Sequence, residues 1–121
     1  MRFPTPDPGT GRVTAREAAR LATTTDAVLL DVRELPEWRA GHAPEATHLP
    51  LSALAAGAAL PAPAQARPLL VICRTGRRSQ RAAEILTARG AHAVDVIGGM
   101  VDWAAAGLPV VDAHGGNGAV A

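Results

Sequence analysis

The chain has 121 residues, 48% of them hydrophobic, which suits one domain with a core of ordinary size. Its net charge is +1, so it lacks the strongly basic balance typical of binding to nucleic acid or an anionic membrane. Residues 1–11 carry three prolines and no apolar segment like that of a signal peptide, and predict a flexible lead-in. No apolar run reaches the about 18 residues of a membrane span. A single cysteine fits a reducing compartment, and we expect a cytoplasmic protein.

The first part of the chain predicts two helices on either side of one buried strand. Thr14 either extends a short edge strand or caps a helix over 15–22, with Glu17 placed three residues later as in a capping box. The nearly continuous apolar run 27–32 is typical of a strand that is buried on both faces. A short helix over 34–40 follows it, with a proline tolerated in its first turn.

The rest of the chain continues the alternation of strands and helices. The expected elements are an extended piece at 47–50, a helix over 52–60, a connector at 61–68, strands at 69–72 and 93–97, a helix over 79–89 and a short helix after the Gly98–Gly99 turn. Such alternation predicts an α/β domain over 12–111, in which a mostly parallel central sheet is covered by helices on both faces. The Gly-rich segment 112–121 predicts a flexible tail.

Cys73 is the only cysteine, and it stands between a buried strand and an arginine-rich loop. Ligands of parallel sheets bind outside the carboxyl ends of the strands, where Cys73 is expected. The Thr75–Gly76 turn lets successive N–H groups converge, and the following helix adds its own free N–H groups. Together with three loop arginines, these groups favour thiolate over thiol. The sequence therefore predicts a reactive nucleophile, and the alternative is a structural cysteine in the core.

The loop and three further segments resemble the single-domain rhodaneses. Cys73–Ser79 resembles the active-site loop of that family. The other similar segments, in the order expected for the family, are Asp31–Val32–Arg33 with Glu37–Trp38, the stretch 41–51, and Gly98–Gly99–Met100 with Trp103. The resemblance covers about residues 12–111, and several weak motifs in register are much more specific than one.

This resemblance implies a sulfurtransferase that works without a metal or organic cofactor. The thiolate of Cys73 would attack the sulfane sulfur of a donor such as thiosulfate, and the resulting persulfide would pass its sulfur to cyanide, a thiol or a protein sulfur carrier. The candidate binding residues are Arg74, Thr75, Gly76, Arg77, Arg78 and Ser79. Of the arginines, we expect Arg78 first and Arg74 second to face the donor. Ser79 either caps the following helix or donates to the sulfur.

Two other functions remain open. Dual-specificity phosphatases of the cell-cycle type, and arsenate reductases, use a cysteine loop that wraps an oxyanion. In the phosphatases five residues separate the cysteine from the arginine, whereas four lie between Cys73 and Arg78. The shorter loop favours a single sulfur atom as cargo. The other alternative is a non-catalytic binding or regulatory module with the same fold.

Asp31 and Arg33, at the end of the strand next to Cys73, are expected to support the site. We interpret them as a structural ion pair or as loop hydrogen bonds, and not as proton-transfer groups. Glu37 is expected to pair with Arg33 or Arg39 at the surface.

The histidines and tryptophans are interpreted as structural. His42 and His48 lack a third ligand at suitable spacing, so no metal site is predicted. Trp38 and Trp103 are expected to anchor the core, and Met100 to pack near the pocket.

Overall fold

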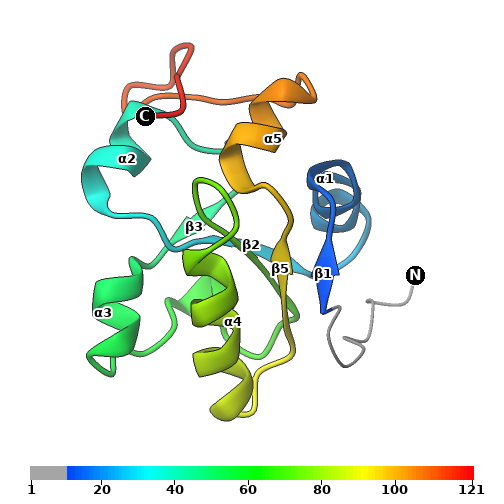
Figure 1. The fold of residues 1–121 in the computed structure, drawn as a ribbon, viewed down its shortest axis with the longest axis vertical. Coiled ribbons are helices and arrows are strands. Elements are labelled where there is room, and N and C mark those ends of the chain that lie inside the picture. The colour runs from blue at the N-terminus through cyan, green and yellow to red at the C-terminus, as the bar shows by residue number, and fades with distance from the viewer. Residues whose placement is uncertain (1–10) are drawn as a thin grey trace.

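The computed structural model describes residues 11–121, which form one five-stranded sheet with every strand pair parallel. The strand order is β1-β5-β4-β2-β3, so β4 lies at the centre (Figure 1). The strands are β1 (Arg12–Val13), β2 (Val28–Asp31), β3 (Thr47–His48), β4 (Leu69–Ile72) and β5 (Ala93–Val96). The predicted α/β class with a parallel sheet is confirmed.

Helices connect the strands and cover both faces of the sheet. They are α1 (Ala15–Thr24), α2 (Leu35–Ala40), α3 (Leu51–Ala55), the short 3-10 helix η1 (Ala62–Ala64), α4 (Arg78–Ala88) and α5 (Gly99–Ala105). Buried side chains of α1 and α5 share one core cluster, and those of α3 and α4 share the other. Within residues 11–121, no helix has both the length and the apolar character needed to cross a membrane.

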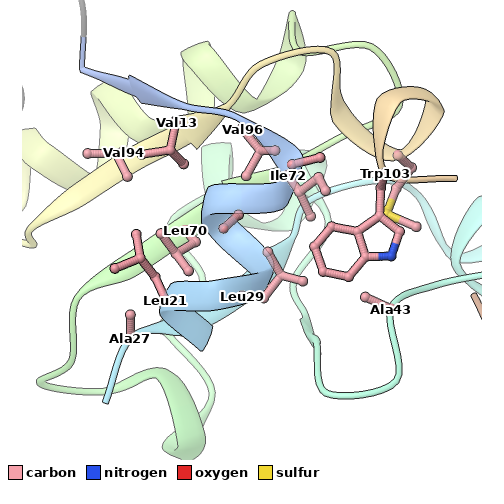
Figure 2. Close-up of a cluster of buried hydrophobic side chains, with 13 residues drawn as sticks. Val13, Leu21, Ala27, Leu29, Ala43, Leu70, Ile72, Val94, Val96 and Trp103 are labelled. Atoms are coloured by element: carbon pink, nitrogen blue, oxygen red, sulfur yellow. The ribbon is translucent and has the colours of Figure 1, made fainter. Parts of the chain in front are cut away.

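Two hydrophobic clusters form because side chains alternate between the faces along each strand. Figure 2 shows the cluster on the α1 side, where Leu21 and Trp103 pack against strand residues such as Leu70 and Val96. The other cluster joins Leu54 and Leu86 to β2 and β4, and Cys73 belongs to it. All four residues of β2 and of β4 are buried, as the continuous apolar runs predict.

Thr14 follows the edge strand and caps α1. Arg12–Val13 forms the edge strand β1, and Thr14 then caps α1 by accepting the N–H of Glu17 on its hydroxyl oxygen at 3.1 Å. Of the expected lead-in 1–11, residues 1–10 lie outside the described residues. The carbonyl oxygen of Gly11 accepts the N–H of Asp95 at 3.2 Å, which continues the pairing of β1 with β5.

One predicted helix is shorter in the structure. The alanine-rich stretch 52–60 forms only α3, which ends at Ala55. Gly57 has a φ of +100°, in the left-handed region that glycine favours, and it turns the chain out of the helix.

The expected flexible tail at 112–121 differs from the structure, which folds this segment back onto α2. The N–H of Ala119 donates to the carbonyl of Ala40 at 3.0 Å, and Val111 bridges both His42 and Asn117. Val120 packs against the cluster on the α1 side. The glycines here permit a tight turn whose main-chain groups find partners, so their presence does not by itself indicate a structureless segment.

Candidate active site

Cys73 lies immediately after the central strand β4, at the carboxyl edge of the sheet. Its side chain is 1% exposed and belongs to the core cluster on the α4 side. The loop 74–77 connects it to α4, and is the green loop above that helix in Figure 1. The sheet topology therefore places the sulfur where ligands of parallel sheets bind.

The Cys73 sulfur is surrounded by hydrogen-bond donors from its own loop. The N–H of Gly76 donates to Sγ at 3.1 Å, and the hydroxyl oxygen of Ser79 lies 3.4 Å from Sγ. Burial acts to raise the pKa of Cys73, but the side chain of Ser79 and the N–H groups of Ser79, Gly76 and Thr75 outweigh it and lower the pKa below its ordinary value. Gly76 has a φ of +95°, which suits a glycine at the turn that aims its N–H at the sulfur.

Ser79 contacts the sulfur and does not cap α4. It is fully buried, and its hydroxyl also donates to Oδ2 of Asp95 at 3.1 Å. The N-cap position of α4 is held by Arg77, whose side chain makes no capping bond. Of the two roles considered for Ser79, the geometry supports the contact with sulfur.

Arg12 and Asp95 are part of this site, although the sequence did not single them out. Asp95 is 2% exposed, and Arg12 is its register partner on the neighbouring strand. Arg12 donates from Nε to Oδ1 at 2.9 Å and from Nη2 to Oδ2 at 3.1 Å, and Nη2 also reaches the carbonyl of Gly76 at 3.2 Å. The sequence did carry one signal for them, a carboxylate inside the apolar run 93–97. A buried charge is rare without a partner, so this carboxylate indicates a partner elsewhere in the chain.

The three loop arginines have different surroundings. Arg78 makes a two-pronged ion pair with Glu37 of α2, with both N···O distances 2.7 Å. The expected pairing of Glu37 with Arg33 or Arg39 is wrong, because the fold brings α2 beside the start of α4. Arg74 donates to the carbonyl oxygen of Ala121 at 2.8 Å, and both Arg74 and Arg77 are exposed.

The ion pair of Arg78 with Glu37 is electrostatically linked to the cysteine. The hydrogen bond with Arg78 is the main cause that lowers the pKa of Glu37 below its ordinary value. The same hydrogen bond raises the pKa of Arg78, and the negative charge of Cys73 raises it further. The charge of Arg78 is thus coupled to that of the sulfur.

Asp31 and Arg33 form the predicted ion pair. Both side chains are 0% exposed, and Nη2 of Arg33 lies 2.8 Å from Oδ2 of Asp31. Arg33 also donates to the carbonyl of Gly41 at 2.7 Å, which fixes the loop that carries α2. Nη1 of Arg33 has no hydrogen-bond partner among residues 11–121. The pair therefore ties the end of β2 to the C-terminal end of α2.

The two histidines stack against Trp38 outside the core. The ring centroids of Trp38 and His42 are 3.6 Å apart, and those of Trp38 and His48 are 4.8 Å apart. Each histidine has a carbonyl partner at 2.7 Å, from Trp38 for His42 and from Arg33 for His48. Across residues 11–121, no group of three His, Cys, Asp or Glu side chains could hold a metal ion.

The tryptophan prediction is correct for one residue and wrong for the other. Trp103 is 0% exposed, and its indole N–H donates to the carbonyl of Pro109 at 2.9 Å. Trp38 is only half-buried, because α2 lies at the edge of the sheet and buries none of its residues. Met100 is fully buried in the cluster on the α1 side, as expected from packing.

The Gly98–Gly99 turn brings the start of α5 against the cysteine loop. The N–H of Met100 donates to the carbonyl of Cys73 at 2.8 Å, and that of Val101 donates to the carbonyl of Arg74 at 3.0 Å. A Cβ atom at Gly99 would overlap the carbonyl oxygen of Cys73. Gly99 is therefore required for the close approach of α5, which bonds to the main-chain carbonyls of Cys73 and Arg74.

We expect Gly99→Ala to destabilise the protein by about 1–3 kcal/mol, the usual cost of overpacking. Urea denaturation measures this loss. The matched control is Gly107→Ala, since Gly107 has a positive φ too but nothing lies within 4 Å of its added Cβ. Equal losses in the two variants would show that backbone strain, and not contact with the loop, sets the cost.

The fold and the site together define a class of α/β proteins that hold a buried cysteine beside main-chain N–H groups at the end of a central strand. Residues 14–106 match the Rhodanese-like domain. The chain therefore belongs to the rhodanese-like family.

Relatives agree with this membership. A sulfurtransferase of Allochromatium vinosum is 34% identical over 98 residues, covering 79% of this chain and 89% of that protein. The adenylyltransferase and sulfurtransferase MOCS3-2 of Zea mays is 36% identical over 103 residues, which cover 79% of this chain. The chain spans about a fifth of the length of that maize protein, because the match covers 21% of it.

A solved structure carries the same likeness. The rhodanese-related protein of Thermoplasma volcanium is 30% identical and superposes with a TM-score of 0.71, covering 83% of this chain and 96% of that one. The fold and the sequence thus lead to the same family.

Proposed function

We propose that this protein is a sulfurtransferase whose Cys73 carries the transferred sulfur as a persulfide. The observation that carries the proposal is the set of hydrogen bonds at Sγ, which lowers the pKa of Cys73 despite its burial. A thiolate is the nucleophilic form of cysteine, so these bonds favour the form of Cys73 that attacks sulfur.

The first half-reaction is a displacement at sulfur. The Cys73 thiolate attacks the sulfane sulfur of thiosulfate, a new S–S bond forms, and the bond to the sulfonate group breaks with its electron pair leaving on sulfite. The terminal sulfur of the persulfide then carries the negative charge. The N–H groups of Gly76 and Ser79 are suited to hold that charge, as main-chain donors do in anion-binding loops.

In the second half-reaction an acceptor removes the terminal sulfur. Cyanide attacks it, thiocyanate leaves, and the Cys73 thiolate is restored. A thiol or a protein sulfur acceptor reacts in the same way, and two separate half-reactions predict ping-pong kinetics. We place the reaction in the reducing cytoplasm, where a free thiol persists.

Steady-state assays with one sulfur donor–acceptor pair and one phosphate ester test the proposed function. The full chain is expected to form thiocyanate from thiosulfate and cyanide with ping-pong kinetics, and to leave p-nitrophenyl phosphate intact. Hydrolysis of the phosphate ester without thiocyanate formation would support the phosphatase alternative. Absence of both activities, together with no sulfur bound to Cys73, would support the binding module.

The phosphatase alternative receives no support from the site. The arginine at position 78 follows Cys73 after four residues, and its guanidinium is already held at two points by Glu37. An arginine that wraps a phosphate needs that face for the oxyanion.

The ion pair of Arg78 with Glu37 predicts opposite effects of two substitutions on the KM for thiosulfate. Arg78→Ala removes a cation beside the site and should raise KM several-fold. Glu37→Gln removes a negative charge and releases the guanidinium, so it should lower KM. Initial rates over a range of thiosulfate concentrations measure both effects.

Arg81→Ala is the matched control, since Arg81 lies on the same helix and its side chain is 67% exposed. Its KM should equal that of the unmodified protein. An unchanged KM in Arg78→Ala would show that Arg78 does not contribute to donor binding.

A further inference from the structure

The hydroxyl of Ser79 has one proton and two neighbours that can accept it. Its oxygen lies 3.4 Å from the sulfur of Cys73 and 3.1 Å from Oδ2 of Asp95. When Cys73 is a thiol, the S–H donates to Ser79, and Ser79 donates to Asp95. When Cys73 is a thiolate it can only accept, so the hydroxyl must leave Asp95 in order to donate to the sulfur.

The position of Asp95 makes this competition a built-in feature of the fold. Asp95 lies on β5 beside Val71, its register partner on β4, and Cys73 follows two residues after Val71 on the same face. Ser79 comes from the first turn of α4, which packs on that face. The carboxylate of Asp95 thus lies on a buried face of the sheet whose other positions carry mainly apolar side chains.

Arg12 donates one hydrogen bond to each carboxylate oxygen of Asp95. Its guanidinium reaches both carboxylate oxygens and also the carbonyl of Gly76 in the cysteine loop. A carboxylate that accepts two charge-assisted hydrogen bonds has less need of a third donor. The ion pair therefore reduces the pull of Asp95 on the Ser79 proton and leaves that proton available to the sulfur.

We propose that Asp95 is a positioning residue that competes with the Cys73 sulfur for the single proton of Ser79, and that Arg12 weakens this competition. The proposal rests on the proposed role of Cys73 as a nucleophile. The network of Arg12, Asp95 and Ser79 thereby sets how readily the sulfur ionises.

Other charged groups also lie on the elements around the Cys73 sulfur. The elements around the sulfur carry Arg12 on β1, Asp95 on β5, Arg78 on α4, Glu37 on α2, the ion pair of Asp31 and Arg33 at the end of β2, and the exposed loop residues Arg74 and Arg77. Glu37 is held by Arg78, and Asp31 is held by Arg33. Asp95 is the carboxylate of this set that shares a hydrogen-bond donor with the sulfur.

Two substitutions within this one network are expected to have opposite effects. After burial, which raises the pKa of Cys73, the Ser79 side chain is the largest single influence and lowers it. Ser79→Ala should therefore leave less thiolate at a given pH. Asp95→Asn removes the competing charge and substitutes a weaker acceptor, so it should leave more. A network that only supported packing would respond to both substitutions in the same direction.

The rate of alkylation of Cys73 by iodoacetamide, measured across pH on the full chain, tests this prediction. Below the pKa the rate follows the thiolate fraction, and we expect Ser79→Ala to lower it about tenfold and Asp95→Asn to raise it about threefold. In the double variant Ser79→Ala with Asp95→Asn, the effect of Asp95→Asn on the rate should be smaller, because the Ser79 hydroxyl through which Asp95 acts is absent. Glu84→Gln, on the exposed face of α4, is the control and should leave the rate unchanged.

A lower alkylation rate in Asp95→Asn would overturn the proposal, and so would an undiminished Asp95→Asn effect in the Ser79→Ala background. If Asp95→Asn fails to fold, Arg12→Gln provides a second test at a side chain that is 33% exposed. It should lower the rate, since it frees Asp95 to hold the Ser79 proton, and an unchanged rate would contradict the proposal. Iodoacetamide needs no sulfur donor, so these results stand even if the proposed sulfur transfer is not found.

Discussion

Cys73→Ser is expected to abolish transfer of sulfur from thiosulfate to cyanide, with a fall in rate of at least about a thousandfold, while the fold is retained. A serine hydroxyl is not ionised near neutral pH and does not attack sulfane sulfur, so the first half-reaction is lost. Its size is close to that of the thiol, and the N–H of Gly76 and the hydroxyl of Ser79 can still bond to it. Thiocyanate formation measures the loss, and a urea denaturation curve verifies the fold. A well-folded variant with activity near that of the unmodified protein would exclude Cys73 as the sulfur carrier.

Asp31→Ala is expected to reduce the free energy of unfolding by about 3–5 kcal/mol, the usual cost of leaving one partner of a buried ion pair without the other. Both side chains of this pair are 0% exposed, so water cannot solvate the Arg33 charge that remains. Urea denaturation measures the effect.

Two further variants show whether burial is the cause of that loss. Glu17→Ala breaks an exposed pair with Arg20, and should cost less than about 1 kcal/mol. Asp31→Ala combined with Arg33→Met removes both charges, and should be more stable than Asp31→Ala alone. A single-variant loss as small as that of Glu17→Ala would show that the Asp31–Arg33 pair contributes little to holding α2.

Features with a strong local pattern could be predicted from the sequence. The run 69–72 was expected as a buried strand and forms β4, because four consecutive apolar residues are typical of a strand covered on both faces. The place of Cys73 followed from the alternation of strands and helices, which requires a parallel sheet with its ligand site at the carboxyl edge. The family resemblance added the chemistry, since the local pattern alone indicates a reactive thiolate and not its cargo.

Features that depend on strand order could not be predicted in the same way. Arg12 and Asp95 meet because β1 and β5 are neighbours, although 83 positions separate the two residues. Glu37 meets Arg78 across 41 positions, because α2 returns over the start of α4. No local sequence pattern indicates that residues so far apart along the chain come into contact. The tail 112–121 differed for a related reason, since its hydrogen-bond partners lie near residue 40.

The mass of the intact protein after incubation with thiosulfate tests the central claim most directly. We expect a gain of one sulfur atom on the full chain, its loss on addition of cyanide, and no gain in Cys73→Ser. Fragmentation should place the added sulfur on the peptide that contains Cys73. An unmodified mass after thiosulfate, or the same gain in Cys73→Ser, would contradict the assignment of Cys73 as the persulfide carrier.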